Sequence, residues 1–286
     1  MDNNNSYNTD RKIKLNNGME IPCIGFGTYQ IRKKNELENS VKEAYKAGYR
    51  LFDTAVMYGN EKFIGDTLKK HKIPRKDIFL TTKILPSEMT YEKTKKSIES
   101  SLKKLQCDYL DMVLIHWPEV DKTEDRIKVW QALEESVSGG KVKMIGVSNF
   151  CKIHLEHILK NCKIKPVINQ IECNPIYWDK ETIDYSLQNG IVIEAYCPLA
   201  EWSPQLVQNK IILDLAKKKN KTVPQIILKW IMQKNMIPLP KSVHTEYIKE
   251  NFNLNGFCLT DEEMKNVDTL NSINYKVDWD PHSVPL

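Results

Sequence analysis

The stretch IFLTTK, residues 78–83, is an apolar run that ends on the ammonium group of Lys83. A second apolar run reaches Asp53, a third ends at His116, and Tyr58 follows shortly after the second. Ionisable groups are costly in apolar surroundings unless they are paired. Taken singly, the lysine fits a solvated strand end, the aspartate a helix cap, the histidine a hydrogen-bonded core residue and the tyrosine a core or surface residue. Taken together, the four side chains predict one shared site.

Apolar runs alternate with segments whose apolar residues recur at helical spacing along most of the chain. Eight runs are strand candidates, at residues 23–29, 50–55, 78–83, 109–116, 142–147, 167–171, 191–195 and 236–239. Continuous apolar strands are typical of parallel sheets that are covered on both faces. Gly25 and Gly27 in the first run fit either the close approach of another molecule or a tight corner of the fold. Eight strand–helix units in about 260 residues predict a (β/α)8 (TIM) barrel, whose active site lies at the C-terminal ends of the strands.

Both ends of the chain carry features outside this alternation. Residues 13–21 predict a β-hairpin that closes the bottom of the barrel, with Asn17-Gly18 as a two-residue type I′ turn. Residues 1–10 are polar, and we expect them to be disordered. Residues 272–286 are expected to form a tail near the substrate pocket. No linker divides the chain, so residues 1–286 are expected to form a single barrel domain.

Composition narrows the class of protein. Of the 286 residues, 41% are hydrophobic and 28% are charged, which is typical of a globular chain. A net charge of +5 is too mild to indicate nucleic-acid binding, and it suits an anionic small molecule equally well. No run approaches the roughly 18 apolar residues of a membrane span, and the N-terminus lacks the features of a signal peptide. We therefore expect neither nucleic-acid nor membrane partners.

The seven cysteines indicate a reducing compartment. Their number is odd and no pair has CxxC spacing, so we expect reduced thiols and a cytoplasmic location. The densest group of possible metal ligands, Cys151, His154, His157 and Cys162, has a spacing that matches no known zinc pattern. We therefore expect no metal ion.

Polar or aromatic side chains stand at the end of every strand candidate. They are Thr28, Asp53, Lys83, His116, Ser148, Asn149, Gln170, Tyr196 and Lys241. Solvated strand ends would show a scatter of residue types. Amides and hydroxyls on successive strands, followed by a tyrosine and a lysine, instead predict a lining for a flat polar ring and for anionic groups.

Seven motifs carry a resemblance to a known family. They are FDTA at residues 52–55, YGNE at 58–61, TK at 82–83, IHWP at 115–118, GVSNF at 146–150, NQ at 169–170 and PKS at 240–242. In these motifs, and in their order between about residue 13 and about residue 270, the chain resembles the aldo-keto reductases. The resemblance implies an NAD(P)H-dependent oxidoreductase that reduces aldehyde or ketone carbonyls to alcohols without a metal or a flavin. It also implies a catalytic tetrad of Asp53, Tyr58, Lys83 and His116.

The resemblance further implies where the cofactor binds. Ser148, Asn149 and Gln170 would bind the nicotinamide carboxamide, and Tyr196 would stack on the ring. The other cofactor-binding residues that it implies are Gly27, Thr28, Tyr29, Asp53, Cys197, Leu199, Lys241, Ser242, Val243, Tyr247, Glu250 and Asn251. No GxGxxG motif follows a strand, so a Rossmann site is not indicated.

Two positions depart from the family pattern. Family members often have serine where this chain has Cys197, which puts one hydrogen bond near the pyrophosphate in doubt. Where the family has an arginine six residues after the lysine of the PKS motif, this chain has Tyr247. A tyrosine keeps a flat face but loses the charge that meets a 2′-phosphate. We therefore expect NADPH to be preferred over NADH by a smaller margin than is usual in the family.

The four tetrad residues have complementary chemical roles. A phenol of ordinary pKa, about 10, is a sluggish acid near pH 7, so the Lys83 ammonium is expected to lower the pKa of Tyr58. Asp53 would hold Lys83 in place, and His116 would hydrogen-bond the substrate oxygen. The substrate pocket is expected to comprise Tyr29, Met57, Tyr58, His116 and Trp117. Nothing in the sequence selects among aldoses, lipid aldehydes, keto acids and α-dicarbonyls.

Two other functions fit the same residues. One is a Schiff-base lyase that uses Lys83 as its nucleophile on a phosphate-binding barrel. The other is a non-catalytic NADP(H)-binding subunit that senses redox state. For the reductase we expect a small-molecule carbonyl substrate and a monomer or weak dimer.

Overall fold

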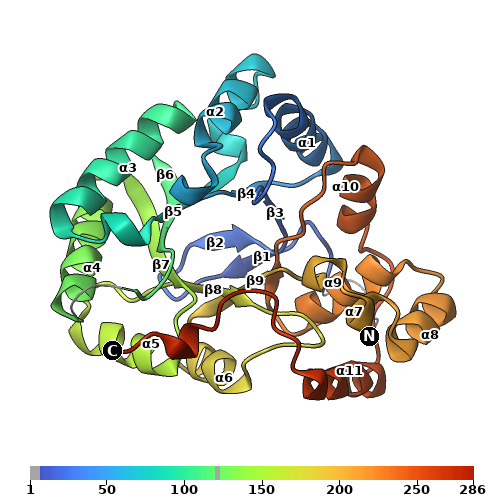
Figure 1. The fold of residues 1–286 in the computed structure, drawn as a ribbon. Coiled ribbons are helices and arrows are strands. Elements are labelled where there is room, and N and C mark those ends of the chain that lie inside the picture. Colours follow the sequence, from blue (N-terminus) through green and yellow to red (C-terminus); the bar gives the residue numbers. More distant parts are fainter. Residues whose placement is uncertain (1–6, 120–122) are drawn as a thin grey trace.

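The computed structural model describes residues 7–119 and 123–286, and it contains eight parallel strands surrounded by helices (Figure 1). The strands are β3 (Gly25–Gly27), β4 (Leu51–Asp53), β5 (Phe79–Ile84), β6 (Leu110–Ile115), β7 (Val142–Ser148), β8 (Ile168–Glu172), β9 (Val192–Tyr196) and β10 (Ile237–Pro238). Each strand pairs with its neighbour in the chain, from β3 to β10. The amide of Gly27 donates to the carbonyl of Pro240 at 3.0 Å, which links the first strand to the end of the last. The predicted (β/α)8 barrel is confirmed.

Helices follow the strands and cover the barrel. They are α1 (Lys34–Ala47), α2 (Glu61–Lys70), α3 (Tyr91–Leu105), α4 (Thr123–Ser138), α5 (Lys152–Asn161), α6 (Lys180–Gln188), α7 (Pro204–Val207), α8 (Lys210–Lys219), α9 (Val223–Gln233), α10 (Thr245–Phe252) and α11 (Asp261–Asp268). Two helices begin at threonine caps: the Thr90 side chain accepts the Lys93 amide, and Thr260 forms a capping box with Glu263. No helix of the described residues is long and apolar enough to cross a bilayer.

The two glycines of β3 are explained by closure of the barrel. A Cβ atom on Gly25 would lie 2.5 Å from Leu239 Cδ2 and 2.7 Å from the Leu51 side chain. A Cβ atom on Gly27 would lie 3.2 Å from the carbonyl oxygen of Leu239. Of the two explanations for these glycines, the tight corner is sufficient, because the last strand packs directly on them.

The N-terminal hairpin fills the bottom of the barrel. Its strands β1 (Lys12–Lys14) and β2 (Glu20–Pro22) are antiparallel, and Leu15 and Ile21 are buried in the same apolar cluster as the first residues of β4 and β5. The predicted type I′ turn is wrong, because Asn17 lacks the positive φ that this turn requires. Gly18 has φ 83°, and Leu15 N–H donates to the Met19 carbonyl at 2.8 Å. The connection is therefore a three-residue loop with glycine in the left-handed position.

The prediction of disorder over residues 1–10 is wrong for residues 7–10. The amide of Thr9 donates to Asn255 Oδ1 at 2.9 Å, and the Lys229 ammonium donates to the carbonyl of Tyr7 at 2.9 Å. Lys229 lies on α9 and is fully buried, so its charge needs an acceptor, and the N-terminal segment supplies one. The rest of the predicted segment lies outside the described residues.

Candidate active site

Lys83 lies at the centre of a buried cluster at the C-terminal ends of β4 and β5. Its Nζ donates to both carboxylate oxygens of Asp53, at 2.6 and 2.7 Å, and to the carbonyl of Thr54 at 3.0 Å. Nζ also lies 3.2 Å from the hydroxyl of Tyr58. Asp53 is paired with Thr81 in the sheet, and Lys83 projects from the same face of β5 as Thr81. The strand register therefore brings the carboxylate and the ammonium together.

Tyr58 reaches this cluster from a short turn after β4. The turn is the 3-10 helix η2 (Val56–Tyr58), and it ends at Gly59, which has φ 68°. The phenol ring lies 5.0 Å from the ring of Tyr29 and 5.8 Å from that of His116, measured between centroids. The cation, the phenol and the imidazole thus meet around one point.

The pKa of Tyr58 is raised well above its ordinary value of 10, so the sequence-based prediction of a lowered pKa is wrong. The main cause is burial, which disfavours the phenolate, and the second is the nearby Asp53 carboxylate. Asp53 accepts two hydrogen bonds from Lys83 and offsets much of the effect of the ammonium charge on the phenol. Tyr58 is consequently a phenol that keeps its proton at neutral pH and can donate it. Lys83 would act when the proton leaves, by stabilising the oxygen that becomes charged.

His116 is neutral in this environment. Its side chain follows β6 and is 5% exposed, and burial followed by the charge of Lys83 lowers its pKa to about 3. Its Nδ1 atom has no hydrogen-bond partner among the described residues. The backbone of His116 is held by the residue that follows β7, because Asn149 Nδ2 donates to the His116 carbonyl at 3.0 Å. A neutral imidazole retains one N–H donor, which suits a hydrogen bond to a substrate oxygen.

The predicted nicotinamide-binding residues form a connected network on β7, β8 and β9. Tyr196 donates its hydroxyl hydrogen to Asn149 Oδ1 at 2.8 Å, and Ser148 Oγ donates to the Gln170 carbonyl at 2.9 Å. Gln170 Nε2 donates to Asp53 Oδ2 at 3.0 Å and to Glu194 Oε2 at 2.7 Å. This network joins the predicted cofactor residues to the tetrad.

A pocket of about 470 Å³ opens above these side chains. The predicted residues that line it are Gly27, Tyr29, Asp53, Met57, Tyr58, His116, Trp117, Ser148, Asn149, Gln170, Tyr196, Cys197, Leu199 and Lys241. Lys83 lies beneath it, bonded to Asp53 and Tyr58. The structure therefore brings most of the predicted catalytic, substrate and cofactor residues to one cavity.

Six predicted cofactor residues do not line the pocket: Thr28, Ser242, Val243, Tyr247, Glu250 and Asn251. The Thr28 hydroxyl donates to the Asp53 carbonyl at 2.8 Å, so it positions the strand end. The carboxylate of Glu250 accepts a hydrogen bond from Thr222 at 2.9 Å, which ties it to the start of α9. Tyr247 is 52% exposed near the start of α10. Among these six residues, Tyr247 is open to solvent, whereas Asn251 is buried.

Several further residues line the pocket that were not named individually from the sequence, although Asp278 lies in the C-terminal tail expected near it. They are Gln30, Pro198, Glu201, Trp202, Leu239, Pro240 and Asp278. Gln30 and Glu201 face each other from different loops, with 3.5 Å between Nε2 and Oε1. Glu194, which contacts Gln170, was also missed, although a carboxylate inside the apolar run 191–195 was a visible signal.

The C-terminal tail closes one side of the pocket. The Glu172 carboxylate accepts the backbone amides of Val277 and Asp278, at 2.8 and 3.0 Å. Trp279 follows and lies 5.4 Å from Trp117, ring centroid to ring centroid. These contacts place the tail beside the expected substrate residues.

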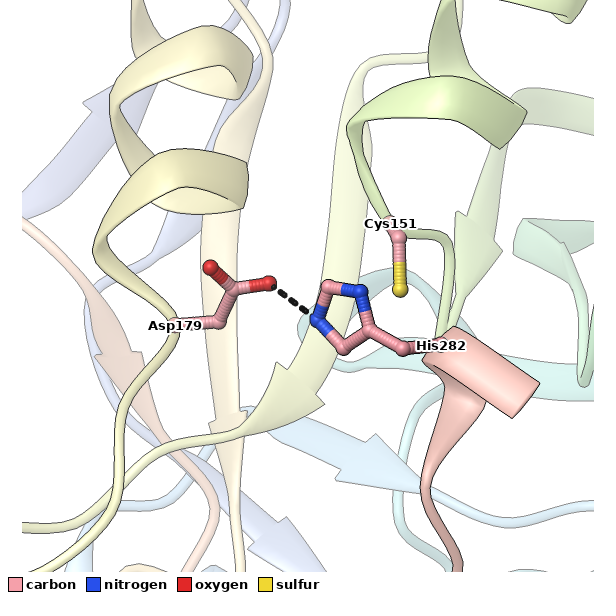
Figure 2. A group of neighbouring side chains, drawn as sticks. All are labelled: Cys151, Asp179 and His282. Atoms are coloured by element: carbon pink, nitrogen blue, oxygen red, sulfur yellow. Dashed lines mark hydrogen bonds and ion pairs between the residues drawn. The ribbon is translucent and has the colours of Figure 1, made fainter. Parts of the chain in front are cut away.

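One cluster outside the pocket could offer metal ligands. Cys151, Asp179 and His282 have ligand atoms within 4.8 Å of one another (Figure 2). His282 Nε2 already bonds to Asp179 Oδ2 at 3.0 Å, and burial raises the pKa of the Cys151 thiol to about 12. We interpret this cluster as a tether that holds the 3-10 turn Pro281–Ser283 against α5 and α6.

Comparisons with known proteins agree with this geometry. The model of the "Aldo/keto reductase family" matches residues 23–272. The chain is 42% identical over 259 residues to "Glyoxal reductase" of Bacillus subtilis (strain 168), covering 91% of this chain and 92% of that protein. It is 35% identical over 252 residues to "Methylglyoxal reductase DkgA" of Escherichia coli O157:H7, covering 88% of this chain and 90% of that protein.

Solved structures show the same likeness. An aldo-keto reductase from a Medee basin deep-sea metagenome library superimposes with a TM-score of 0.91 at 38% identity, covering 96% of this chain and all of that one. A Bombyx mori aldo-keto reductase in complex with NADP superimposes with a TM-score of 0.88 at 31% identity, covering 94% of this chain and 95% of that one. The chain therefore belongs to the aldo/keto reductase family and is an oxidoreductase that acts on carbonyl groups with NADP(H).

Proposed function

We propose that Tyr58 is the proton donor for carbonyl reduction and that Lys83, Asp53 and His116 support it. The observation that carries this proposal is the ammonium of Lys83, which bonds to Asp53 at 2.6 Å and lies 3.2 Å from the Tyr58 hydroxyl. As the phenol releases its proton to the substrate oxygen, the ammonium stabilises the phenolate that forms. Asp53 keeps the ammonium in place. His116 donates a hydrogen bond to the same substrate oxygen and orients it.

The residues of the pocket fit a nicotinamide cofactor. Bound NADPH supplies the hydride, whereas the protein supplies orientation and electrostatics. Both N–H groups of the Gln170 amide are engaged by carboxylates, so its carbonyl oxygen remains as an acceptor for a carboxamide NH2. Tyr196 lines the same pocket and offers a ring face, and exposed Lys241 offers a cation for a phosphate.

The same geometry disfavours a Schiff-base lyase. A lysine that attacks a carbonyl must lose its proton and reach the substrate. Lys83 is fully buried, and its ammonium donates to both oxygens of Asp53 and to the Thr54 carbonyl. These contacts occupy the ammonium hydrogens and keep Lys83 away from the pocket.

For the substrate we propose small uncharged aldehydes, α-oxoaldehydes included. Two relatives carry the names glyoxal reductase and methylglyoxal reductase. The pocket is lined by Tyr29, Met57 and Trp117, and by Asp278, which carries a carboxylate. That carboxylate disfavours an anionic keto acid by repulsion.

The test is turnover of NADPH with a panel of carbonyls, followed by the loss of nicotinamide absorbance. The panel contains glyoxal, methylglyoxal, an aldose and a keto acid. We expect the highest kcat/KM with the α-oxoaldehydes. Equal or better turnover of the keto acid would contradict the proposed substrate class, and no turnover of any carbonyl would contradict the catalytic roles.

We also propose a cytoplasmic enzyme that is a monomer or a weak dimer. All seven cysteines lie in the described residues, and none is joined to another in a disulfide there. This arrangement is typical of a reducing compartment. Light scattering of the purified protein over a range of concentrations tests the oligomeric state, and fractionation of the source cells tests the location.

A further inference from the structure

Glu194 is a buried acid that the proposed mechanism does not use. It lies on β9, is fully buried and does not line the pocket. Its Oε2 atom accepts a hydrogen bond from Gln170 Nε2 at 2.7 Å. Its Oε1 atom has no hydrogen-bond partner among the residues that the structure describes. Burying a carboxyl group with one oxygen atom unpaired costs folding free energy. Its presence therefore indicates a role of Glu194 other than packing.

The contact with Glu194 fixes which way the Gln170 amide faces. Carboxylate oxygens at 2.7 Å and 3.0 Å, from Glu194 and Asp53, surround the Nε2 atom. Ionised carboxylates only accept hydrogen bonds, so the NH2 group must point inward and the carbonyl oxygen toward the pocket. Asp53 also accepts two hydrogen bonds from the Lys83 ammonium. Of the two acceptors of the Gln170 amide, Glu194 is therefore the one that is not also bonded to Lys83.

We propose that Glu194 is a positioning residue for the nicotinamide, acting through Gln170. By holding the amide NH2, it presents the Gln170 carbonyl oxygen to the carboxamide NH2 of the cofactor. The two anchors from β4 and β9 define the plane of the amide before the cofactor arrives. This inference rests on the proposed binding of the nicotinamide by Gln170.

The positioning does not require a charge on Glu194. The polar and charged groups that act on its carboxyl are Gln170, Asp53 and Lys83, and its sheet partner on β10 is the apolar Ile237. Burial and the Asp53 carboxylate raise the pKa of Glu194 to about 7, so both protonation states are present near neutral pH. Either state can accept through Oε2. A neutral side chain of the same shape should therefore hold Gln170 as well.

The experiment compares Glu194→Met, which removes the acceptor, with Glu194→Gln, which keeps an acceptor and removes the charge. Binding is measured by titration with NADPH and with 2′-phospho-ADP-ribose, a fragment that lacks the nicotinamide. For Glu194→Met we expect NADPH affinity to fall about tenfold, as for one lost buried hydrogen bond, with the fragment unaffected. For Glu194→Gln we expect both affinities to stay within about twofold of the wild type.

A second comparison asks whether Glu194 acts through Gln170. In a Gln170→Ala background, the change Glu194→Met should have little further effect on NADPH affinity. Full additivity of the two changes would overturn the proposal, and so would wild-type NADPH affinity in Glu194→Met or an equal loss for the fragment. Should Glu194→Met fail to fold, Glu194→Asp, which withdraws the carboxylate by one methylene, must show the same selective loss. Wild-type protein that turns over no carbonyl would instead contradict the proposed function itself.

Discussion

The two ends of the proposed cofactor site differ in how strongly their side chains are already held by hydrogen bonds within the protein. At the proposed nicotinamide end, Asp53, Gln170 and Glu194 are at most 4% exposed and are joined by hydrogen bonds through the Gln170 amide. At the proposed adenosine end, Tyr247 is 52% exposed, and the Ser242 hydroxyl is hydrogen-bonded to the backbone of His244, within its own loop. The first group lies at buried positions of strands, whereas Tyr247 in the second group is open to water.

This contrast separates two kinds of mutational effect. In the buried network each side chain is hydrogen-bonded to another side chain. One substitution there should therefore change both catalytic activity and the free energy of unfolding. At the solvated end a side chain can change without leaving an unpaired group behind. We expect substitutions there to alter affinity for one cofactor and little else.

The largest effect is expected for Tyr58→Phe. The ring can keep its packing between Tyr29 and His116, but the proton donor is lost. We expect kcat to fall at least ~10²-fold, the lower end of general acid catalysis, with the NADPH dissociation constant little changed. Steady-state rates and a cofactor titration measure the two quantities. Near-normal turnover would remove Tyr58 from the mechanism.

The next largest effect is expected for Lys83→Met. The substitution leaves the Asp53 carboxylate buried with only Gln170 as a side-chain donor. Breaking a buried ion pair on one side costs about 3–5 kcal/mol, so the free energy of unfolding should fall by about that amount and activity should be lost. The matched control is Asp53→Asn combined with Lys83→Met, which should recover stability but not activity. A double variant as unstable as Lys83→Met would show that the stranded charge is not the cause.

A pH-dependent effect on stability is expected for Glu194→Gln. The pKa of Glu194 is raised from 4.5 to about 7, so the folded state binds its proton more tightly than the unfolded state does. Wild-type stability should therefore fall as pH rises from about 4.5 through 7, by up to roughly 3 kcal/mol for this one group. Glutamine has no such proton to lose. In urea unfolding, the variant should gain stability relative to wild type at pH 8 and much less at pH 5, whereas an equal difference at both pH values would contradict the raised pKa.

The smallest effect is expected for Tyr247→Arg at the solvated end. An arginine near the start of α10 would offer the 2′-phosphate of NADPH a bidentate charged contact that tyrosine lacks. We expect kcat/KM with NADPH to rise by roughly tenfold or less and that with NADH to stay nearly unchanged. Parallel rate measurements with the two cofactors decide this. Equal gains for both would show that the phosphate is not recognised here.

Sequence reasoning located the tetrad because parallel strands of one barrel end at the same rim. Asp53, Lys83 and His116 each stand at a strand end, so their convergence follows from the topology once eight strands are counted. The same reasoning missed Glu194, since a single acid within an apolar run does not reveal which face it occupies. It also places Glu250 in the cofactor site, which stays a prediction; in the structure its carboxylate accepts a hydrogen bond from Thr222.

By itself, the sequence determined the barrel, the hairpin at its bottom and the family. These features depend on the local periodicity of apolar residues, on turn residues and on the order of motifs. All three can be read from one sequence. Only the tertiary structure decided that the pKa of Tyr58 is raised, that Glu194 and Asp53 share the Gln170 amide, and that Tyr7 and Thr9 are hydrogen-bonded to Lys229 and Asn255. Each of these depends on burial and on charges brought from distant segments, and the energy of an ionisable group is set by those surroundings rather than by its neighbours in sequence.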